Sequence, residues 1–438
     1  MAEGSSFDDL VVSLCSRLLA IDTTNRGAGD AKGERPAAEF VAGQLAEAGI
    51  ESTFLEREPG RTNLIARVPG ENPDLPAVLL QGHLDVVPAD PAEWSVHPFS
   101  GEVHDGYVWG RGATDMKDTV AAAITAVRRW AAEGRRPRRD VVLAFVADEE
   151  DKGYWGAHWL VEQHPEYFAG VAAAISESGG FTHRVGDKRI YPIGAAERGT
   201  AHVRLIAKGR AGHASRINDD NAVIRLVGAL HRIAEHHWPV HLTPAVRAHI
   251  EGVGAALGIA VDLSSEAEVD ATLARLGDGA SLAAATVRPS TVPTVLQAGY
   301  KVNVIPGQAV AEVDVRTLPG TEAMVLTELN RLIGSGIAVE PITYQEAVSA
   351  PIDSPWFAAM ADALRAEDPE AVVVPYCLGG GTDAKAFSEL GIACYGFAPV
   401  FVPRGYPYRA MAHGVDERIP VEGLRFAARV LDRFLSTC

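Results

Sequence analysis

Four consecutive carboxylates, Asp148-Glu149-Glu150-Asp151, directly follow an apolar run at residues 141–147. An apolar run of this kind is typical of a strand that is buried on both faces of a sheet. Placing four acids at the end of such a strand costs electrostatic energy unless cations lie beside them. A solvated acidic loop is the alternative interpretation, because acidic runs are common on protein surfaces. The residues that follow the other predicted strands decide between the two.

Further imidazoles and carboxylates lie at the ends of those strands. The run at 77–81 leads into Gly82-His83-Leu84-Asp85, and the run at 171–175 leads into Ser176-Glu177. Asp115 opens a predicted helix after a Gly-rich segment, and His413 lies beyond the last predicted strand. Ligands of an open parallel sheet bind beyond the carboxyl ends of its strands. One His-x-Asp pair or one buried Glu is usually structural, so the prediction depends on their occurring together.

Imidazoles and carboxylates without thiolates are typical of a catalytic zinc site, with cobalt or manganese as substitutes. Two ions fit better than one. The four negative charges of Asp115, Glu150, Glu177 and a bridging hydroxide would cancel the charge of two divalent cations. Two such ions activate a shared water and polarise a carbonyl group. Glu149, next to a ligand but itself free, is placed to move the proton of that water. Asp85 is expected to orient the His83 imidazole through a hydrogen bond.

The elements that position these residues alternate between helix and strand, which predicts an α/β fold with a mostly parallel sheet. The pattern changes near residue 197 to strand-helix-strand-strand-helix-strand, the order of a ferredoxin-like α+β domain. Its predicted elements span residues 201–207, 222–233, 294–304, 309–317, 322–333 and 337–345. Residues 244–292 form an insertion whose structure the sequence does not indicate. We expect a discontinuous catalytic domain, 1–196 and 350–438, and an inserted lid or dimerisation domain, 197–349.

Composition narrows the class of protein. A chain of 438 residues exceeds what one hydrophobic core usually serves. The formal net charge of −17 argues against nucleic acid or an anionic membrane as a partner. No apolar run approaches the ~20 residues of a membrane span, and residues 1–9 lack the features of a signal peptide. The four cysteines include no close metal-binding pair, and Cys377 is better explained as a buried thiol than as a nucleophile. We therefore expect a cytoplasmic protein.

Three of these segments resemble the motifs of the di-zinc amidohydrolases, which include aminoacylase, glutamate carboxypeptidase, carboxypeptidase S, acetylornithine deacetylase and succinyl-diaminopimelate desuccinylase. The matching segments are residues 82–88, 110–117 and 148–150. The resemblance implies that Asp115 bridges two zinc ions, that Glu149 is the general base, and that the other ligands divide between the two ions. It pairs His83 with Glu177 at one zinc, and Glu150 with His413 at the other. Asp118 replaces a common Gly, and His97 replaces an acid, but neither change affects a ligand.

The resemblance also gives the inserted domain a role. Residues 208–215 match a lid motif, which implies that His213 polarises the scissile carbonyl in the active site of a partner subunit, within a homodimer. Asn303 and Arg316 match positions that hold the substrate, and Arg316 suits a bidentate grip on a carboxylate. In the run Gly379-Gly380-Gly381-Thr382-Asp383, the backbone N–H groups of Gly380 and Gly381, with Thr382, would cradle a carboxylate. This run lacks the spacing of a nucleotide-binding motif.

The expected function is zinc-dependent hydrolysis of an amide next to a free carboxylate, in an N-acyl-amino acid or at a peptide C-terminus. Within the resembled family, a Glu at position 177 goes with aminoacylases and carboxypeptidases, and an Asp with aminopeptidases and dipeptidases. The closing residues 396–400 and 413–417 are most similar to carboxypeptidase S. Biosynthetic deacylation of ornithine or diaminopimelate precursors is the alternative. A metal- or carboxylate-binding protein without activity would lack the base, and Glu149 is present. A di-metal phosphatase would need more basic groups than Arg316 and Lys385.

Overall fold

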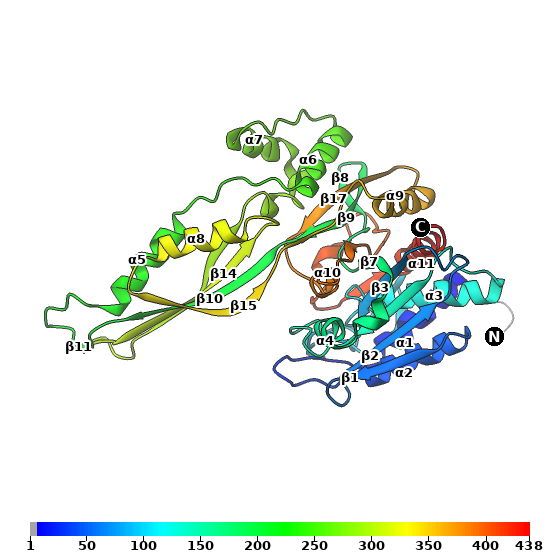
Figure 1. Cartoon of the computed structure of the whole chain (residues 1–438), viewed down its shortest axis with the longest axis horizontal. Coiled ribbons are helices and arrows are strands. Elements are labelled where there is room, and N and C mark those ends of the chain that lie inside the picture. Colours follow the sequence, from blue (N-terminus) through cyan, green and yellow to red (C-terminus); the bar gives the residue numbers. More distant parts are fainter. Residues whose placement is uncertain (1–6) are drawn as a thin grey trace. The chain divides into compact units, whose positions relative to one another are not determined.

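A computed structural model describes residues 7–438 in two compact units (Figure 1). The first unit comprises residues 1–195, 350–375 and 382–438, and the second comprises residues 196–349 and 376–381. Residues 376–381, which the sequence places with the catalytic domain, thus cluster with the second unit. The expectation about a signal peptide depends partly on residues 1–6, which lie outside the described residues. No helix within residues 7–438 is long and apolar enough to cross a membrane.

The first unit contains a largely parallel sheet, as predicted. Its central strands are β6 (Val141–Val146), β3 (Ala77–His83), β7 (Val171–Ser176) and β18 (Ala393–Gly396), and they run parallel to one another. Two antiparallel strands, β1 (Ser52–Glu56) and β2 (Thr62–Val68), extend one side, and β9 (Lys188–Glu197) pairs with β18 on the other. Every residue of β3 and β6 is buried, which explains the apolar sequence of β6 and of the first four residues of β3. Three of the parallel strands therefore end at one edge, where the predicted ligands begin.

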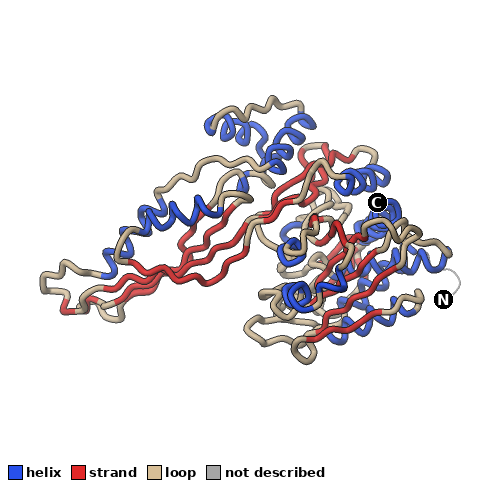
Figure 2. The backbone as a smooth tube through the Cα atoms, in the orientation of Figure 1, coloured by secondary structure: helices blue, strands red, loops and turns tan. Residues whose placement is uncertain are grey.

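Helices pack on this sheet and on one another (Figure 2). Helices α2 (Arg35–Ala46) and α3 (Lys117–Glu133) contact the sheet, and α1 (Phe7–Leu19) and α11 (Val421–Thr437) pack on α3. A separate core joins side chains of β3 and β6 to α4 (Ala157–Gln163), the 3₁₀-helix η1 (Pro165–Phe168) and α10 (Ala384–Ser388). The sheet is therefore rigidly held at the base of the loops that carry the ligands.

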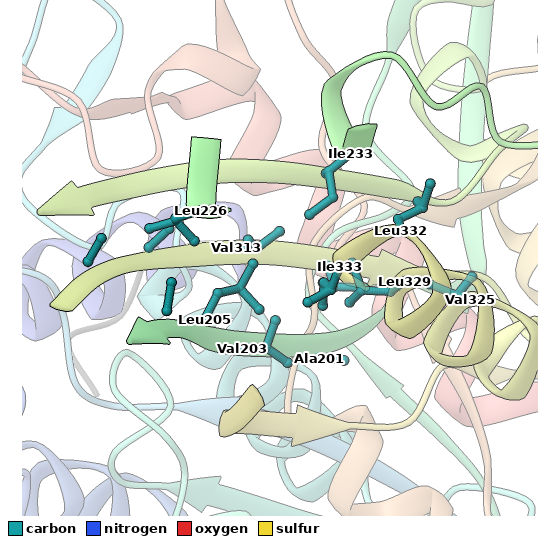
Figure 3. Packing of buried hydrophobic residues seen from close by; sticks show 14 of the residues in the cluster. Ala201, Val203, Leu205, Leu226, Ile233, Val313, Val325, Leu329, Leu332 and Ile333 are labelled. Atoms are coloured by element: carbon teal, nitrogen blue, oxygen red, sulfur yellow. The ribbon is translucent and has the colours of Figure 1, made fainter. Parts of the chain in front are cut away.

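The second unit is built on a four-stranded antiparallel sheet in the order β12 (Ser290–Ala298), β14 (Gln308–Thr317), β10 (Gly199–Lys208) and β15 (Ile337–Gln345). Helices α5 (Ala222–Ala234) and α8 (Glu322–Ile333) pack on it and complete the predicted strand-helix-strand-strand-helix-strand order. Figure 3 shows the core between them, where Val203, Leu205 and Val313 of the sheet meet Leu226, Leu329 and Ile333 of the helices. Alternate residues of β10 and β14 are buried, as half-exposed strands require.

Two details of this unit differ from the sequence-based expectation or go beyond it. β12 covers residues 290–298 rather than 294–304, because the chain turns at Gly299, whose φ is +68°. The insertion at 244–292 contains two helices, α6 (Pro244–Leu257) and α7 (Glu266–Leu276), and two 3₁₀ turns, η2 (Gly277–Ala280) and η3 (Ala284–Thr286). Two short strands, β11 (Gly212–His213) and β13 (Val304–Ile305), pair with each other.

Candidate metal centre

Asp115 lies between two imidazoles in the first unit. Its Oδ1 is 3.0 Å from Nε2 of His83, which ends β3, and its Oδ2 is 3.1 Å from Nε2 of His413. The same His413 nitrogen lies 3.2 Å from Oε2 of Glu150, which follows β6. One carboxylate oxygen therefore faces each ring, which is the arrangement that a carboxylate bridging two cations requires.

The remaining predicted ligand, Glu177, lies on the His83 side of this arrangement. Single ligand atoms of His83, Glu149 and Glu177 lie within 4.8 Å of one another, and so do those of His83, Asp115 and Glu150. Donors around one divalent ion at bond lengths of about 2.0–2.2 Å are separated by distances of this order. The residues predicted as metal ligands are thus brought together from the end of β3 and from four loops, and Glu149 lies among them.

The pKa values in this cluster reflect crowded negative charge. Burial raises the pKa of Glu149 and of Glu177 well above the ordinary value, and the charge of a neighbouring carboxylate adds to each shift. Burial also raises the pKa of Glu150, although the hydrogen bond from His413 opposes it. Asp115 differs, because hydrogen bonds from both imidazoles outweigh its burial and lower its pKa. Buried carboxylates at this density are stabilised by divalent cations, so the residues present fit a pair of metal ions.

The pKa values of the two imidazoles are also raised, because their charged forms are stabilised by the carboxylates around them. Hydrogen bonds with Asp115 and Glu150 raise the pKa of His413 to about 10. Burial disfavours the charged form of His83, yet its hydrogen bond with Asp115 and the surrounding carboxylates raise its pKa well above the ordinary value. The rings thus supply the positive charge that this acidic pocket needs, and metal ions bound there would compete with those protons.

Asp85 holds the acidic loop rather than only the His83 ring. Its carboxylate accepts hydrogen bonds from the backbone N–H groups of Glu149 at 3.2 Å and Glu150 at 3.1 Å, and from Asn25 Nδ2 at 2.9 Å. The His83 ring nitrogen Nδ1 lies 3.0 Å from the backbone carbonyl oxygen of Asp85 and 3.6 Å from its carboxylate. The backbone of Asp85 therefore supplies the nearest acceptor for the ring, while its side chain fixes the residues that follow β6.

A buried arginine braces the same loop from behind. Arg61 Nη2 lies 3.1 Å from Asp148 Oδ1 and 2.9 Å from Glu34 Oε1, and all three side chains are buried. Asp148 also adopts a left-handed backbone conformation, with φ of +69°. A non-glycine residue in that conformation is strained, and the ion pair holds it in place. Burial raises the pKa of Glu34 to about 7, and its hydrogen bonds with Arg61 oppose that shift. Sequence reasoning missed Glu34 and Arg61, because neither lies in a motif.

A second buried ion pair joins the Asp115 and His413 loops. The Glu417 carboxylate accepts hydrogen bonds from Arg111 Nη1 at 2.6 Å, from the backbone N–H of Gly112 at 3.0 Å and from that of Thr114 at 2.7 Å. Arg111 Nη2 in turn donates to the His413 carbonyl oxygen at 3.2 Å. Both side chains lie in segments that carry predicted ligands, but neither was predicted to have a role of its own. They connect two ligand loops that are about 300 residues apart.

The residues predicted to hold substrate lie mostly in the second unit. β11 pairs with β13, so the His213 segment lies beside Asn303, whose carbonyl oxygen accepts a hydrogen bond from Ala214 at 3.1 Å. His213 and Asn303 are exposed, and Ser215 Oγ lies 2.8 Å from His213 Nδ1. Gly380 and Gly381 form an exposed loop after β17 (Ala371–Leu378).

Arg316 and Thr382 are also held by neighbours. The Arg316 guanidinium donates to both carboxylate oxygens of Asp314, at 2.7 and 3.1 Å, and to Thr200 Oγ1 at 3.0 Å. Thr382 belongs to the first unit, where it is buried and its hydroxyl accepts a hydrogen bond from the backbone N–H of Ala384 at 3.1 Å.

A cavity of about 410 Å³ lies in the first unit between the segments that follow Glu177 and precede His413. Its walls include the rings of Phe181, Tyr406 and Tyr408, with Arg184 among the lining residues. The Phe181 and Tyr408 rings contact each other at a centroid distance of 5.4 Å. The cavity therefore combines aromatic, aliphatic and basic side chains and adjoins two chain segments that carry predicted metal ligands.

A parallel-rich sheet with histidines and carboxylates gathered at the ends of its strands defines a metal-dependent hydrolase. A sequence profile of Peptidase family M20/M25/M40 matches residues 79–437, and the chain belongs to this family. It is accordingly a hydrolase of the metallopeptidase class, whose centre of carboxylates and histidines is formed by the first unit.

Several characterised relatives cover most of the chain. The chain is 28% identical to aminoacylase-1 of Homo sapiens over 83% of its length and 80% of the relative's. It is 27% identical to the N-fatty-acyl-amino acid synthase/hydrolase PM20D1 of Xenopus tropicalis, over 86% of the chain and 75% of the relative. It is also 27% identical to the probable carboxypeptidase S-like 2 of Dictyostelium discoideum, over 83% and 72%.

Solved structures confirm the predicted fold class. The M20 family metallo-carboxypeptidase Sso-CP2 of Sulfolobus solfataricus superposes with a TM-score of 0.72 at 18% identity, covering 99% of each chain. The YXEP protein of Bacillus subtilis, described as a dinuclear metal binding peptidase from the M20 family, gives a TM-score of 0.61 at 16% identity, over 98% of this chain and 97% of that one.

Proposed function

We propose that the chain is a di-zinc hydrolase that cleaves an amide bond next to a free carboxylate, in an N-acyl-amino acid or at a peptide C-terminus. The observation that carries the proposal is the convergence of the two imidazoles on Asp115, with Glu149 lying within 4.8 Å of the ligand atoms of His83 and Glu177. The names of the relatives support the substrate class, since they include aminoacylases, an N-fatty-acyl-amino acid hydrolase and a carboxypeptidase. They favour this chemistry over biosynthetic deacylation.

The metal would be held by Asp115 between His83 with Glu177 on one side and Glu150 with His413 on the other. Zinc suits imidazole and carboxylate donors, and cobalt or manganese would substitute for it. When bound, such ions supply a Lewis acid for the scissile carbonyl and lower the pKa of the attacking water.

The chain's own residues then move the protons. Glu149 removes a proton from the water that attacks the amide carbonyl carbon, and it delivers a proton to the nitrogen as the C–N bond breaks. The products are a carboxylic acid and an amine. His213 would donate a hydrogen bond to the carbonyl oxygen as negative charge develops there. Arg316, Asn303 and the Gly380–Thr382 loop would hold the substrate carboxylate, and the aromatic cavity beside Phe181 would suit an apolar acyl or side chain.

We also propose that two copies of the chain associate through the second unit. Several large apolar side chains of this unit are exposed, among them Ile224 of α5 (70%), Leu296 of β12 (59%) and Val302 (100%). These exposed apolar side chains, together with the partner-subunit role that the resembled lid motif implies for His213, support a partner of the same sequence.

The test of the activity is amine release from a panel of N-acyl-amino acids and short peptides in the presence of zinc. A Glu149→Gln variant with equal metal content serves as the control, because it keeps the shape of the side chain and loses the base. Release by the wild type alone would establish the hydrolase and its substrate class. No release from any member of the panel by protein carrying two zinc ions would contradict the proposal.

A further inference from the structure

Arg198 of the second unit carries a buried charge that no carboxylate neutralises. It connects β9 to β10, and only 6% of the residue is exposed. Its Nη2 donates to Ser290 Oγ at 2.7 Å and to the carbonyl oxygen of Arg316 at 3.4 Å, whereas its Nε has no hydrogen-bond partner among the described residues. Within residues 7–438, it makes no ion pair with a carboxylate. An uncompensated buried charge is costly, so this arginine calls for an explanation.

The neighbouring charges do not balance it. Arg198 directly precedes β10, in which Thr200 pairs with Arg316 of β14, so the two arginines lie near each other. Among the described carboxylates, the charge of Asp314 raises the pKa of Arg198, but both oxygens of Asp314 are already bound by Arg316. His202 also lies 3.4 Å from Asp314. Burial lowers the pKa of Arg198 to about 10, and the charge of Arg316 contributes to that shift. The cluster therefore carries excess positive charge.

A loop with room for a ligand starts beside this cluster. The backbone N–H of Arg198 donates to the carbonyl oxygen of Leu378 at 3.1 Å, and residues 379–381 follow directly. A methyl group added at Gly379 or Gly380 would meet no atom within 4 Å. Residues 376–381 cluster with the second unit, so the loop and both arginines belong to one body. The same loop and Arg316 were predicted from the sequence to hold a carboxylate, and Arg198 was not.

We propose that Arg198 is a second carboxylate-binding arginine, which acts with Arg316 and the Gly379–Gly381 loop to hold the free carboxylate of the substrate. This inference rests on the proposed function, which supplies a substrate with that group. The unpaired Nε–H provides one donor, and guanidinium groups bind carboxylates through paired donors that a lysine cannot reproduce. A purely structural role is the competing explanation, because Arg198 also ties β10 to Ser290 of β12.

The decisive measurement is the preference of the enzyme for a free acid over its amide. Kinetics on one N-acyl-amino acid and on its carboxamide would be compared for the wild type, Arg198→Met and Arg198→Lys. Arg204→Met is the matched control, because Arg204 lies on β10, which Arg198 directly precedes, but pairs with Glu312 at 2.8 Å. We expect Arg198→Met to lower kcat/KM for the acid by about 10- to 100-fold, mainly through KM, and to leave the carboxamide nearly unchanged. Arg198→Lys should recover part of the loss, and Arg204→Met should retain the wild-type preference.

Equal losses on the acid and the carboxamide would overturn the inference and leave Arg198 as a structural tie. Calorimetry on the Glu149→Gln background provides a readout without turnover: the acid should bind more tightly than the carboxamide, and Arg198→Met should remove the difference. This binding test separates failure of the inference from failure of the proposed activity. Equally tight binding of inorganic phosphate at the same ionic strength would overturn the assignment to a carboxylate.

Discussion

Glu149 and Glu177 are half-buried beside His83, and desolvation together with the crowded negative charge raises the pKa of both. The two acids nevertheless come from different strands and are expected to do different work. Glu177 follows β7 and is predicted to be a ligand, whereas Glu149 precedes a predicted ligand and is predicted to carry protons. Substitutions of the two residues therefore separate the loss of metal from the loss of the base.

For Glu149→Gln, we expect kcat to fall by about 100- to 10,000-fold with unchanged metal content, because the amide cannot accept a proton. For Glu177→Gln, we expect the bound metal itself to decrease. Steady-state kinetics together with elemental analysis of the purified variants would check both. A Glu149→Gln enzyme that retained more than a tenth of the wild-type kcat would exclude Glu149 as the base.

Asp118 gives a prediction that does not depend on the reaction. Its side chain is buried, its Oδ1 has no hydrogen-bond partner, and burial raises its pKa to about 8. The folded protein therefore holds a proton that the unfolded chain releases at about pH 4. This contribution to stability is complete below that pH and is lost as the pH rises toward 8. Asp118→Asn removes the ionisable group, so the variant should gain stability over the wild type as the pH rises.

Thermal unfolding of both proteins at several pH values between about 5 and 8.5 would check this. Each unit of difference between the folded and unfolded pKa corresponds to about 1.4 kcal/mol in the free energy of unfolding. A chelator should be present, because cations bound beside Asp115 would favour the ionised form of Asp118. The exposed Asp74→Asn serves as the control. A difference in unfolding temperature between Asp118→Asn and wild type that stayed constant with pH would contradict the argument.

At the scale of elements, the ligand loops are held by buried ion pairs as well as by the sheet. Glu417 joins the Asp115 loop to the His413 loop through Arg111, Gly112 and Thr114. In Glu417→Gln, an amide N–H would face groups that are themselves donors. We expect the variant to bind zinc about 10- to 100-fold more weakly, as is usual for the partners that orient metal ligands.

Calorimetric titration of the metal-free protein with zinc would measure this loss. Glu422→Gln is the matched control, because Glu422 pairs with Arg425 at the exposed start of α11. The stabilisation by zinc, taken as the shift in unfolding temperature on adding the metal, should shrink in Glu417→Gln and not in the control. Equal destabilisation with and without zinc would mean that Glu417 only supports the fold.

The same scale shows what the sequence could and could not predict. The strands β3, β6 and β7 were predictable because each contains an apolar run that ends at or just before a predicted metal ligand. The helices α6 and α7 were missed, although Thr243 and Ser265 cap their first turns and Gly258 ends α6 with φ of +68°. Those signals were local and could have been used. The Glu34–Arg61–Asp148 bridge could not be predicted, because its members come from separate elements that only the folded chain brings together.

At the scale of the whole molecule, the predicted dimer has a consequence that kinetics can detect. His213 is exposed on the second unit, and the resemblance to the di-zinc amidohydrolases implies that it serves the active site of the partner subunit. If so, Glu149→Gln and His213→Ala chains, each nearly inactive alone, should complement each other when mixed. Each heterodimer then contains one site with an intact Glu149 and an intact His213.

After random exchange of subunits, half of the dimers contain one chain of each variant. Each of these mixed dimers has one of its two active sites restored. We therefore expect about one quarter of the wild-type activity. The measurement is amine release after the two variants have been unfolded and refolded together, with separately refolded samples as the control. Sedimentation would verify that dimers form, and Ile224→Asp combined with Val302→Asp should weaken them by placing charges among exposed apolar side chains. Dimers that regain no activity would show that His213 acts within its own chain, and a monomer at every concentration would exclude the assembly itself.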